Sequence, residues 1–286
     1  MNEADLLIVR RAYAKQVVAL ALGVADPRLE SALAAVRRED YLGPGPWMTF
    51  RPPDQYAETP DADPVHLYQD ALFGLVPEKR LNNGQPSFLT KLISLGRPAE
   101  GDHAVHVGAG VGYYTAVISH LVGARGRVTA IEYEPDLATR AVRNFASSPN
   151  VRVVQGDGSK SPLEAADVIY VNAGASQIAE VWLDALKDGG RLVLPLTASF
   201  AMPSGVTMTA GAIFLIERRD REYLAGWKSP TAIYPCIGAR DAISDAALAE
   251  GFKKGGERNV KRLYRTGDIP EERCWVRTPS WSLAYA

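Results

Sequence analysis

The stretch AVHVGAGVGYYTAVISHLV, residues 104–122, passes from an apolar run through a glycine-rich segment into a second apolar pattern. A short run such as Ala104–Val107, bounded by glycine, is typical of a buried strand. After the glycines, Val117, Ile118 and Leu121 recur at the spacing of a helix face. A strand, a glycine-rich turn and a helix in this order predict the beginning of a βαβ unit.

The same alternation continues on both sides of this stretch. Further apolar runs predict strands at 128–131, 151–154, 168–171 and 192–194, and amphipathic segments predict helices at 88–95 and 135–145. Apolar strands that are separated by helices form parallel sheets covered on both faces. We therefore expect an α/β fold built around a doubly wound sheet.

The residues before this alternating region predict two helices and then a segment rich in proline and glycine. Apolar spacing predicts a helix from Asp5 to about Leu22, and a second helix after Asp26-Pro27, because Asp caps helices and Pro fits their first turn. Between residues 43 and 66, prolines and glycines interrupt any long element. An ordered loop or lid, and a simple spacer, are the open interpretations of this segment.

The chain is less regular after Pro195, with strand-like pieces at 212–216 and 231–234. We expect three parts. These are N-terminal helices with a Pro-rich substrate-loop segment at 1–85, a Rossmann-like core at 86–235, and a C-terminal extension at 236–286.

Composition narrows the class of protein. The chain has 286 residues, 47% of them hydrophobic, and a net charge of −1, which favours neither nucleic acid nor a membrane surface as partner. The cysteines Cys236 and Cys274 and the four histidines lack metal-ligand spacing, so we expect no metal site. No apolar run approaches the ~20 residues of a membrane span, and the charged start is unlike a signal peptide. These features predict a cytoplasmic protein.

The glycine-rich turn Gly108-Ala109-Gly110-Val111-Gly112 is a candidate cofactor loop, because glycines let backbone N–H groups approach a ligand. Glu132 ends the next predicted strand, where a carboxylate can accept both ribose hydroxyls of an adenosine ligand. A dinucleotide site uses G-x-G-x-x-G, whereas this turn reads G-x-G-x-G. The spacing favours S-adenosylmethionine over a nicotinamide dinucleotide, which stays as a distant alternative.

Two further turns follow predicted strands. Asp157-Gly158 offers an acid for an adenine amino group, although Asp-Gly is also a routine turn. Asn172 ends the strand at 168–171, and we expect it to contact a ligand there or to cap the following helix.

The motifs VHVGAGVGYYTAVIS, AIEYEP, QGDG, DVIYVNAGA and LKDGGRLVLPL, at these spacings, resemble class I S-adenosylmethionine-dependent methyltransferases. Within that superfamily the chain resembles protein-L-isoaspartate O-methyltransferases. The resemblance implies a Rossmann-like sheet with N-terminal helices, and S-adenosylmethionine as the cofactor. The cofactor residues that it implies are Gly108, Ala109, Gly110, Gly112, Tyr113, Glu132, Tyr133, Asp157, Gly158 and Asn172.

The resemblance also implies methylation of a carboxylate, in L-isoaspartyl residues of a damaged protein or peptide. Its substrate loop corresponds to Asn83-Gly84-Gln85-Pro86, where Gly84 replaces a serine common in the family. If the loop is otherwise unchanged, Gly84→Ser should raise activity. Asn83 and Ser87 are candidate substitutes for the hydroxyl.

These departures leave other functions open. His106 stands where the family usually has an acid, and is interpreted either as a buried strand histidine or as a change in the loop. A relative with a different acceptor, and a cofactor-binding protein without catalysis, are the alternatives to isoaspartyl methylation.

Overall fold

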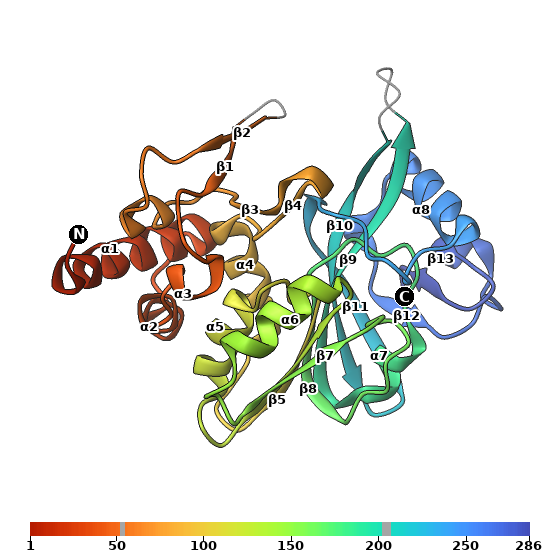
Figure 1. The fold of residues 1–286 in the computed structure, drawn as a ribbon. Helices are drawn as coiled ribbons and strands as arrows, with labels where there is room; N and C mark the ends of the chain where they lie inside the picture. The colour runs from red at the N-terminus through yellow and green to blue at the C-terminus, as the bar shows by residue number, and fades with distance from the viewer. Residues whose placement is uncertain (52–54, 202–206) are drawn as a thin grey trace. The chain divides into compact units, whose positions relative to one another are not determined.

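The structure, a computed structural model, describes residues 1–51, 55–201 and 207–286. Between residues 86 and 201 most strands are separated by helices, whereas three helices follow one another near the N-terminus (Figure 1). The chain divides into two compact units. Unit 1 consists of Met1–Asp102 and Ala109–Gly156, and unit 2 of His103–Gly108 and Asp157–Ala286. The three-part division expected from the sequence stays a prediction.

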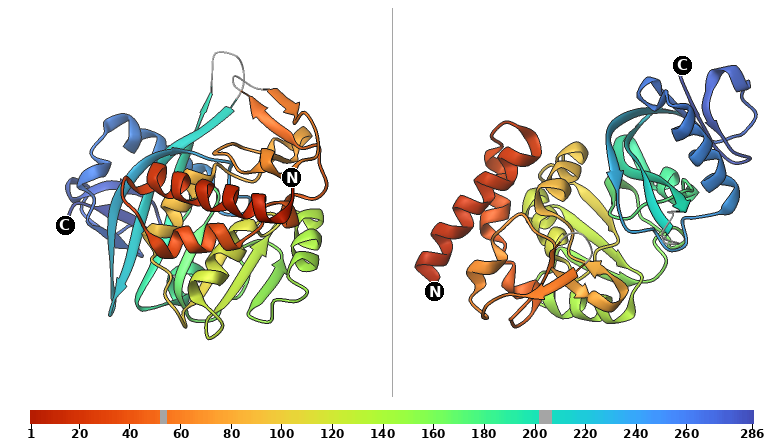
Figure 2. Two further views of the ribbon diagram at one scale, coloured as in Figure 1. Left: turned by 90° about the vertical axis from the view of Figure 1, so that its left-hand side faces the viewer. Right: turned by 90° about the horizontal axis from the view of Figure 1, so that it is seen from above.

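Unit 1 begins with the two predicted helices, the first starting two residues before Asp5, and with a third, short helix that was not predicted. They are α1 (Glu3–Leu22), α2 (Pro27–Ala35) and the short α3 (Glu39–Leu42). The Asp26 carboxylate accepts hydrogen bonds from the amides of Arg28 and Leu29, at 3.0 and 3.1 Å, and so caps α2. Helix α1 packs against α2 and against α4 (Pro86–Gly96) (Figure 2).

The described residues of the proline-rich segment, 43–51 and 55–66, contain regular elements, which favours an ordered loop over a simple spacer; Pro52 and Pro53 lie outside the described residues. The segment contains β1 (Met48–Arg51) paired antiparallel with β2 (Gln55–Glu58), and is followed by β3 (Gly74–Val76) and β4 (Leu81–Asn82). A small apolar cluster lies beneath it, formed by Leu42, Trp47, Leu67 and Phe73. This burial holds the segment that leads to the predicted substrate loop.

The remainder of unit 1 alternates as predicted. Helix α5 (Tyr113–Val122) follows the glycine-rich turn, and α6 (Pro135–Asn144) lies between β6 (Arg127–Glu132) and β7 (Val151–Gln155). Strands β6 and β7 are parallel. A helical connection between parallel strands is the βαβ arrangement expected of an α/β fold.

Unit 2 contains a large mixed sheet. Strands β5 (His103–Val107), β8 (Ala166–Val171) and β9 (Leu186–Ala201) pair in parallel, with α7 (Glu180–Ala185) before β9. Beyond β9, the strands β10 (Thr207–Arg219) and β11 (Glu222–Ala232) add in antiparallel order. The predicted α/β class is confirmed.

Three strand boundaries of unit 2 correct the sequence prediction. The strands predicted at 192–194 and 212–216 are the middles of the much longer β9 and β10, and β11 ends at Ala232 rather than Tyr234. The buried positions along β11 are Tyr223, Ala225, Ser229 and Thr231. Small and polar residues facing inward hide the alternation that would have indicated this strand.

The C-terminal extension continues unit 2. It contains α8 (Ala242–Lys254), β12 (Arg262–Tyr264), β13 (Cys274–Arg277) and β14 (Ser282–Ala284), and these strands extend the sheet from β11. The side chains of Trp275 and Trp281 are buried within it. In the described part of the chain, no helix has the length and apolar character of a membrane span.

Candidate functional site

The glycine-rich turn between β5 and α5 depends on glycine for its backbone. Gly108, Gly110 and Gly112 have φ values of 77°, 57° and 97°, in the left-handed region that side chains disfavour. A Cβ atom on Gly112 would lie 2.4 Å from Cε2 of Phe145, so the turn also requires the missing side chain. The sequence pattern therefore marks a real conformational requirement.

Glu132, at the end of β6, holds this turn within unit 1. Its Oε2 atom accepts a hydrogen bond from the Gly110 amide at 2.6 Å, and its Oε1 atom accepts one from the Glu134 amide at 2.9 Å. The residue is only 7% exposed, and this burial raises the pKa of the Glu132 carboxyl group above its ordinary value. The carboxylate thus acts on the backbone of the loop while keeping further acceptor capacity.

The two tyrosines predicted at this site lie in different surroundings. Tyr113 is buried, and its ring contacts Tyr41 and Tyr114 edge-on, so its side chain belongs to the core of unit 1. Tyr133 is 45% exposed, and its carbonyl accepts a hydrogen bond from Gln155 at 3.2 Å. Of the two side chains, that of Tyr133 is the accessible one.

The predicted substrate loop leads into α4. Asn83 is buried, and its Oδ1 atom accepts a hydrogen bond from the Phe73 amide at 2.7 Å. Asp70 accepts hydrogen bonds from Gln85 Nε2 at 2.9 Å and from both the amide and the hydroxyl of Ser87 at 2.7 Å. The two groups suggested as substitutes for the family serine are therefore engaged in holding the loop itself.

Gly84 gives this loop its shape. Its φ is 76°, its amide donates to Asn82 Oδ1 at 2.9 Å, and its carbonyl accepts a hydrogen bond from Tyr114 at 3.3 Å. An added Cβ would lie 2.2 Å from Cδ1 of Leu89, a fully buried side chain. The loop is built around glycine, which removes the basis for expecting that a serine would simply restore the family pattern.

Asp157 and Gly158 form a tight turn in unit 2. The Asp157 carboxylate accepts hydrogen bonds from the amide and hydroxyl of Ser159 at 2.9 and 2.6 Å, and Lys160 lies 3.1 Å away. Burial acts to raise the pKa of Asp157, but the Ser159 bonds and the Lys160 charge outweigh it, so the pKa lies below its ordinary value. Asp157 is therefore an ionised acceptor at neutral pH.

Asn172 lies directly after β8, at the carboxyl end of the strand. Its amide donates to the Val107 carbonyl at 2.8 Å, and its Nδ2 atom is 3.4 Å from the Gly108 carbonyl. The next helix, α7, begins only at Glu180, so Asn172 does not cap it. Of the two interpretations of Asn172, the helix cap is wrong, and ligand contact stays a prediction.

His106 is a buried strand residue, as the first interpretation held. Its ring is fully buried in β5 and stacks on Tyr170, with the ring centroids 4.9 Å apart. Burial lowers the pKa of His106 to about 3. The ring is therefore neutral at physiological pH.

Three supporting residues were not identified from the sequence. Asp70, Arg240 and Arg38 carry no local sequence signal of their roles. Arg38 is fully buried, donates to the Leu67 and Gln69 carbonyls at 2.5 and 3.0 Å, and lies over the Tyr113 ring at 5.3 Å. It thereby joins the start of α5 to the segment that precedes the substrate loop.

A family model described as protein-L-isoaspartate(D-aspartate) O-methyltransferase matches residues 64–206, half of the chain. Protein-L-isoaspartate O-methyltransferase 2 of Archaeoglobus fulgidus is 44% identical over 101 residues, which cover 34% of this chain and 46% of that protein. The Thermotoga maritima enzyme of the same family is 29% identical over 158 residues, covering 54% and 48%. The chain spans about half the length of these curated relatives.

Solved structures agree on the fold. A protein-L-isoaspartate O-methyltransferase superimposes with a TM-score of 0.61 and 24% identity, over 93% of this chain and 74% of that one. A second such structure, a putative enzyme from Plasmodium falciparum in complex with S-adenosyl-L-homocysteine, gives a TM-score of 0.58 at 15% identity, over 79% and 97%. The predicted class I methyltransferase fold is confirmed.

Proposed function

Because the chain belongs to the protein-L-isoaspartate(D-aspartate) O-methyltransferase family, we propose that it transfers a methyl group from S-adenosylmethionine to a carboxylate of L-isoaspartyl residues. The partner is a protein or peptide that carries this damaged residue. The observation that carries the proposal is the buried Glu132 carboxylate, bonded to the glycine-rich turn through the Gly110 amide.

The residues at this turn fit an adenosine-bearing cofactor. Each Glu132 oxygen accepts one backbone hydrogen bond, and a carboxylate oxygen has capacity for a second, so each can accept a ribose hydroxyl. Among the described residues, an added Cβ on Gly110 would meet just Leu75 Cδ1, at 3.4 Å, so the turn leaves backbone open to a ligand. We assign cofactor binding to Gly108, Ala109, Gly110, Gly112, Tyr113, Glu132, Tyr133, Asp157, Gly158 and Asn172.

When bound, S-adenosylmethionine supplies an electrophilic methyl group. The acceptor carboxylate is already ionised at neutral pH, with an ordinary pKa of about 4, so no general base is needed. What the protein must supply is position and exclusion of water. The loop Asn83–Pro86, held by Asp70 and by the Phe73 amide, is the proposed surface that positions the acceptor.

The proposal is tested by transfer of labelled methyl from S-adenosylmethionine to an isoaspartyl peptide, with the aspartyl peptide of the same sequence as control. We expect labelling of the isoaspartyl peptide alone. Equal labelling of both peptides would contradict the substrate assignment. Cofactor binding without labelling of either peptide would instead favour a family relative with another acceptor, consistent with Gly84 in place of serine.

We also propose that the protein works in the cytoplasm. Its two cysteines, Cys236 and Cys274, are free and buried, which suits a reducing compartment. Cell fractionation with an antibody against the chain tests this location, and recovery outside the cytoplasmic fraction would contradict it.

A further inference from the structure

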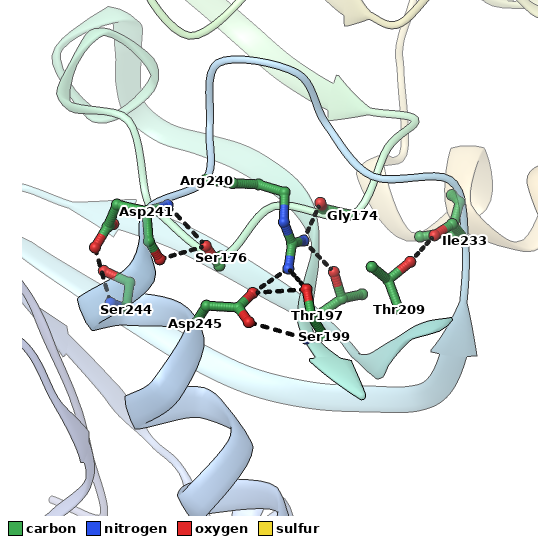
Figure 3. Close-up of polar contacts among 10 residues, drawn as sticks. All are labelled: Gly174, Ser176, Thr197, Ser199, Thr209, Ile233, Arg240, Asp241, Ser244 and Asp245. Carbon is green, nitrogen blue, oxygen red and sulfur yellow. Dashed lines mark hydrogen bonds and ion pairs between the residues drawn. The ribbon is translucent and has the colours of Figure 1, made fainter. Parts of the chain in front are cut away.

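Arg240 lies just before α8, in the C-terminal extension and outside the residues that the family model matches. Its guanidinium group bonds in two directions (Figure 3). The Nη1 atom donates to the Gly174 carbonyl at 2.8 Å and to Thr197 Oγ1 at 2.9 Å. The Nη2 atom donates to Ser199 Oγ at 3.0 Å and to the Asp245 carboxylate.

Asp245 fixes the orientation of this guanidinium. Besides the ion pair, its Oδ2 atom accepts a hydrogen bond from the Ser199 amide at 3.1 Å. The side chains of Arg240 and Asp245 are only 19% and 22% exposed. A mostly buried, charge-assisted pair with additional hydrogen bonds is stronger than an exposed ion pair.

The Gly174 carbonyl belongs to the turn that carries Asn172. This carbonyl also accepts a hydrogen bond from the Cys236 amide at 2.9 Å, and the Gly174 amide donates to the Tyr234 carbonyl at 2.7 Å. A Cβ atom on Gly174 would lie 2.5 Å from Thr197 Oγ1, so the turn lies directly against β9. The turn is thus held by backbone on one side and by Arg240 on the other.

Residues adjacent to Arg240 bind the same turn. The Ala239 carbonyl accepts hydrogen bonds from the amides of Ser176 and Gln177, at 3.0 and 3.1 Å. The Asp241 amide donates to Ser176 Oγ at 3.2 Å, while its carboxylate caps α8 through the Ser244 amide at 2.8 Å (Figure 3). The start of α8 and the turn 172–176 therefore form one bonded assembly.

We propose that Arg240 is a positioning residue for methyl transfer, which sets the turn 172–176, and with it Asn172, at the carboxyl end of β8. Ligands of such sheets bind at the carboxyl ends of the strands. This inference rests on the proposed function, and it makes the C-terminal extension a working part of the site. Arginine is required because a lysine ammonium cannot donate in a planar fork to both groups of acceptors.

Activity measurements on Arg240 variants test the proposal. For Arg240→Ala and Arg240→Lys we expect kcat/KM for the isoaspartyl peptide to fall roughly 10- to 100-fold, the order expected from a small misplacement. The Kd of S-adenosylhomocysteine should rise by a smaller factor, because Asn172 is one of the assigned cofactor residues but Glu132 is untouched. Millimolar guanidinium, but not methylammonium, should restore activity to Arg240→Ala. The matched control is Arg265→Ala, which removes the exposed ion pair with Asp184 in the same unit.

Hydrogen exchange gives a second readout that does not depend on the assigned substrate. Amides of residues 173–176 should exchange faster in Arg240→Ala than in the wild type, while those of α5 should not. If wild-type protein methylates no isoaspartyl peptide, the proposed function fails, and this exchange pattern still tests the assembly. Unchanged exchange at residues 173–176 would overturn the positioning role. The same conclusion would follow if Arg240→Lys and Arg240→Ala both lost activity only in proportion to a loss of folded protein.

Discussion

Each unit contains a backbone turn held by a charged side chain, and the two charges are opposite. In unit 1, Glu132 accepts the amide of Gly110, 22 residues earlier. In unit 2, Arg240 donates to the carbonyl of Gly174, which is 66 residues away. The first turn needs left-handed glycines and has a visible sequence pattern. In the second turn Arg240 binds a backbone carbonyl, which every residue has, and the single Gly174, where a Cβ would meet Thr197, forms no recognisable sequence pattern.

If glycine shapes the unit 1 loops, substitution there should have the largest effect, and Gly84→Ser is the sharpest case. A left-handed φ and contact with the buried Leu89 predict a loss of about 2–4 kcal/mol in the free energy of unfolding, together with lower activity. Urea unfolding and the methyl-transfer assay measure both. Gly84→Ala is the matched control, because it adds the same Cβ without a hydroxyl. Higher activity in the serine variant than in wild type would show that the loop tolerates a side chain.

Glu132→Ala should weaken binding of S-adenosylhomocysteine by about 1–3 kcal/mol, because a charged hydrogen-bond partner is lost. Titration calorimetry measures this change. Glu132→Gln keeps one acceptor oxygen, and we expect an intermediate Kd. An affinity equal to that of wild type in the alanine variant would remove Glu132 from the cofactor site and leave it only as a support of the Gly110 turn.

His106, a buried histidine in unit 2, should make the stability of the protein depend on pH. The folded protein keeps the ring neutral down to about pH 3, whereas the unfolded chain binds a proton near pH 6.5. Stability from this group is therefore complete above pH 6.5 and falls by about 1.4 kcal/mol for each pH unit below it. His106→Phe keeps a ring against Tyr170 and should remove this contribution. Urea unfolding of both proteins at about pH 7.5, 5.5 and 4.5 measures the free energy of unfolding. The wild type should lose more stability than His106→Phe as the pH falls, and an equal loss in both proteins would contradict this role of His106.

The sequence was sufficient for the elements whose signals are local. The N-terminal helices, the strand before Gly108 and the helix after Gly112 follow from apolar spacing and caps. Glu132 could be named as a candidate residue because it ends a predicted strand. In the same way, the family resemblance was carried by contiguous motifs within residues 64–206.

The remainder depends on contacts between residues that are distant in the chain. Of the long strand β11 the sequence predicted the end alone, in the piece at 231–234, because small and polar residues such as Ala225 and Ser229 face inward. The role of Gly84 could not be inferred without seeing Leu89 beside it. Arg240 joins four acceptors from three elements, and no spacing rule relates their positions.

The interleaving of the two units has a consequence for synthesis on the ribosome. The segment His103–Gly108 is made before the second half of unit 1, yet it belongs with residues that follow Gly156. All residues of unit 1 are present once Gly156 has emerged. At that point β5, which is buried along its whole length in the folded protein, still lacks its neighbouring strand β8. A nascent chain stalled between these points would expose an apolar strand edge, the kind of surface that chaperones bind and that aggregates form on. We therefore expect a chain truncated after residue 156 to aggregate rather than to fold into a smaller functional protein.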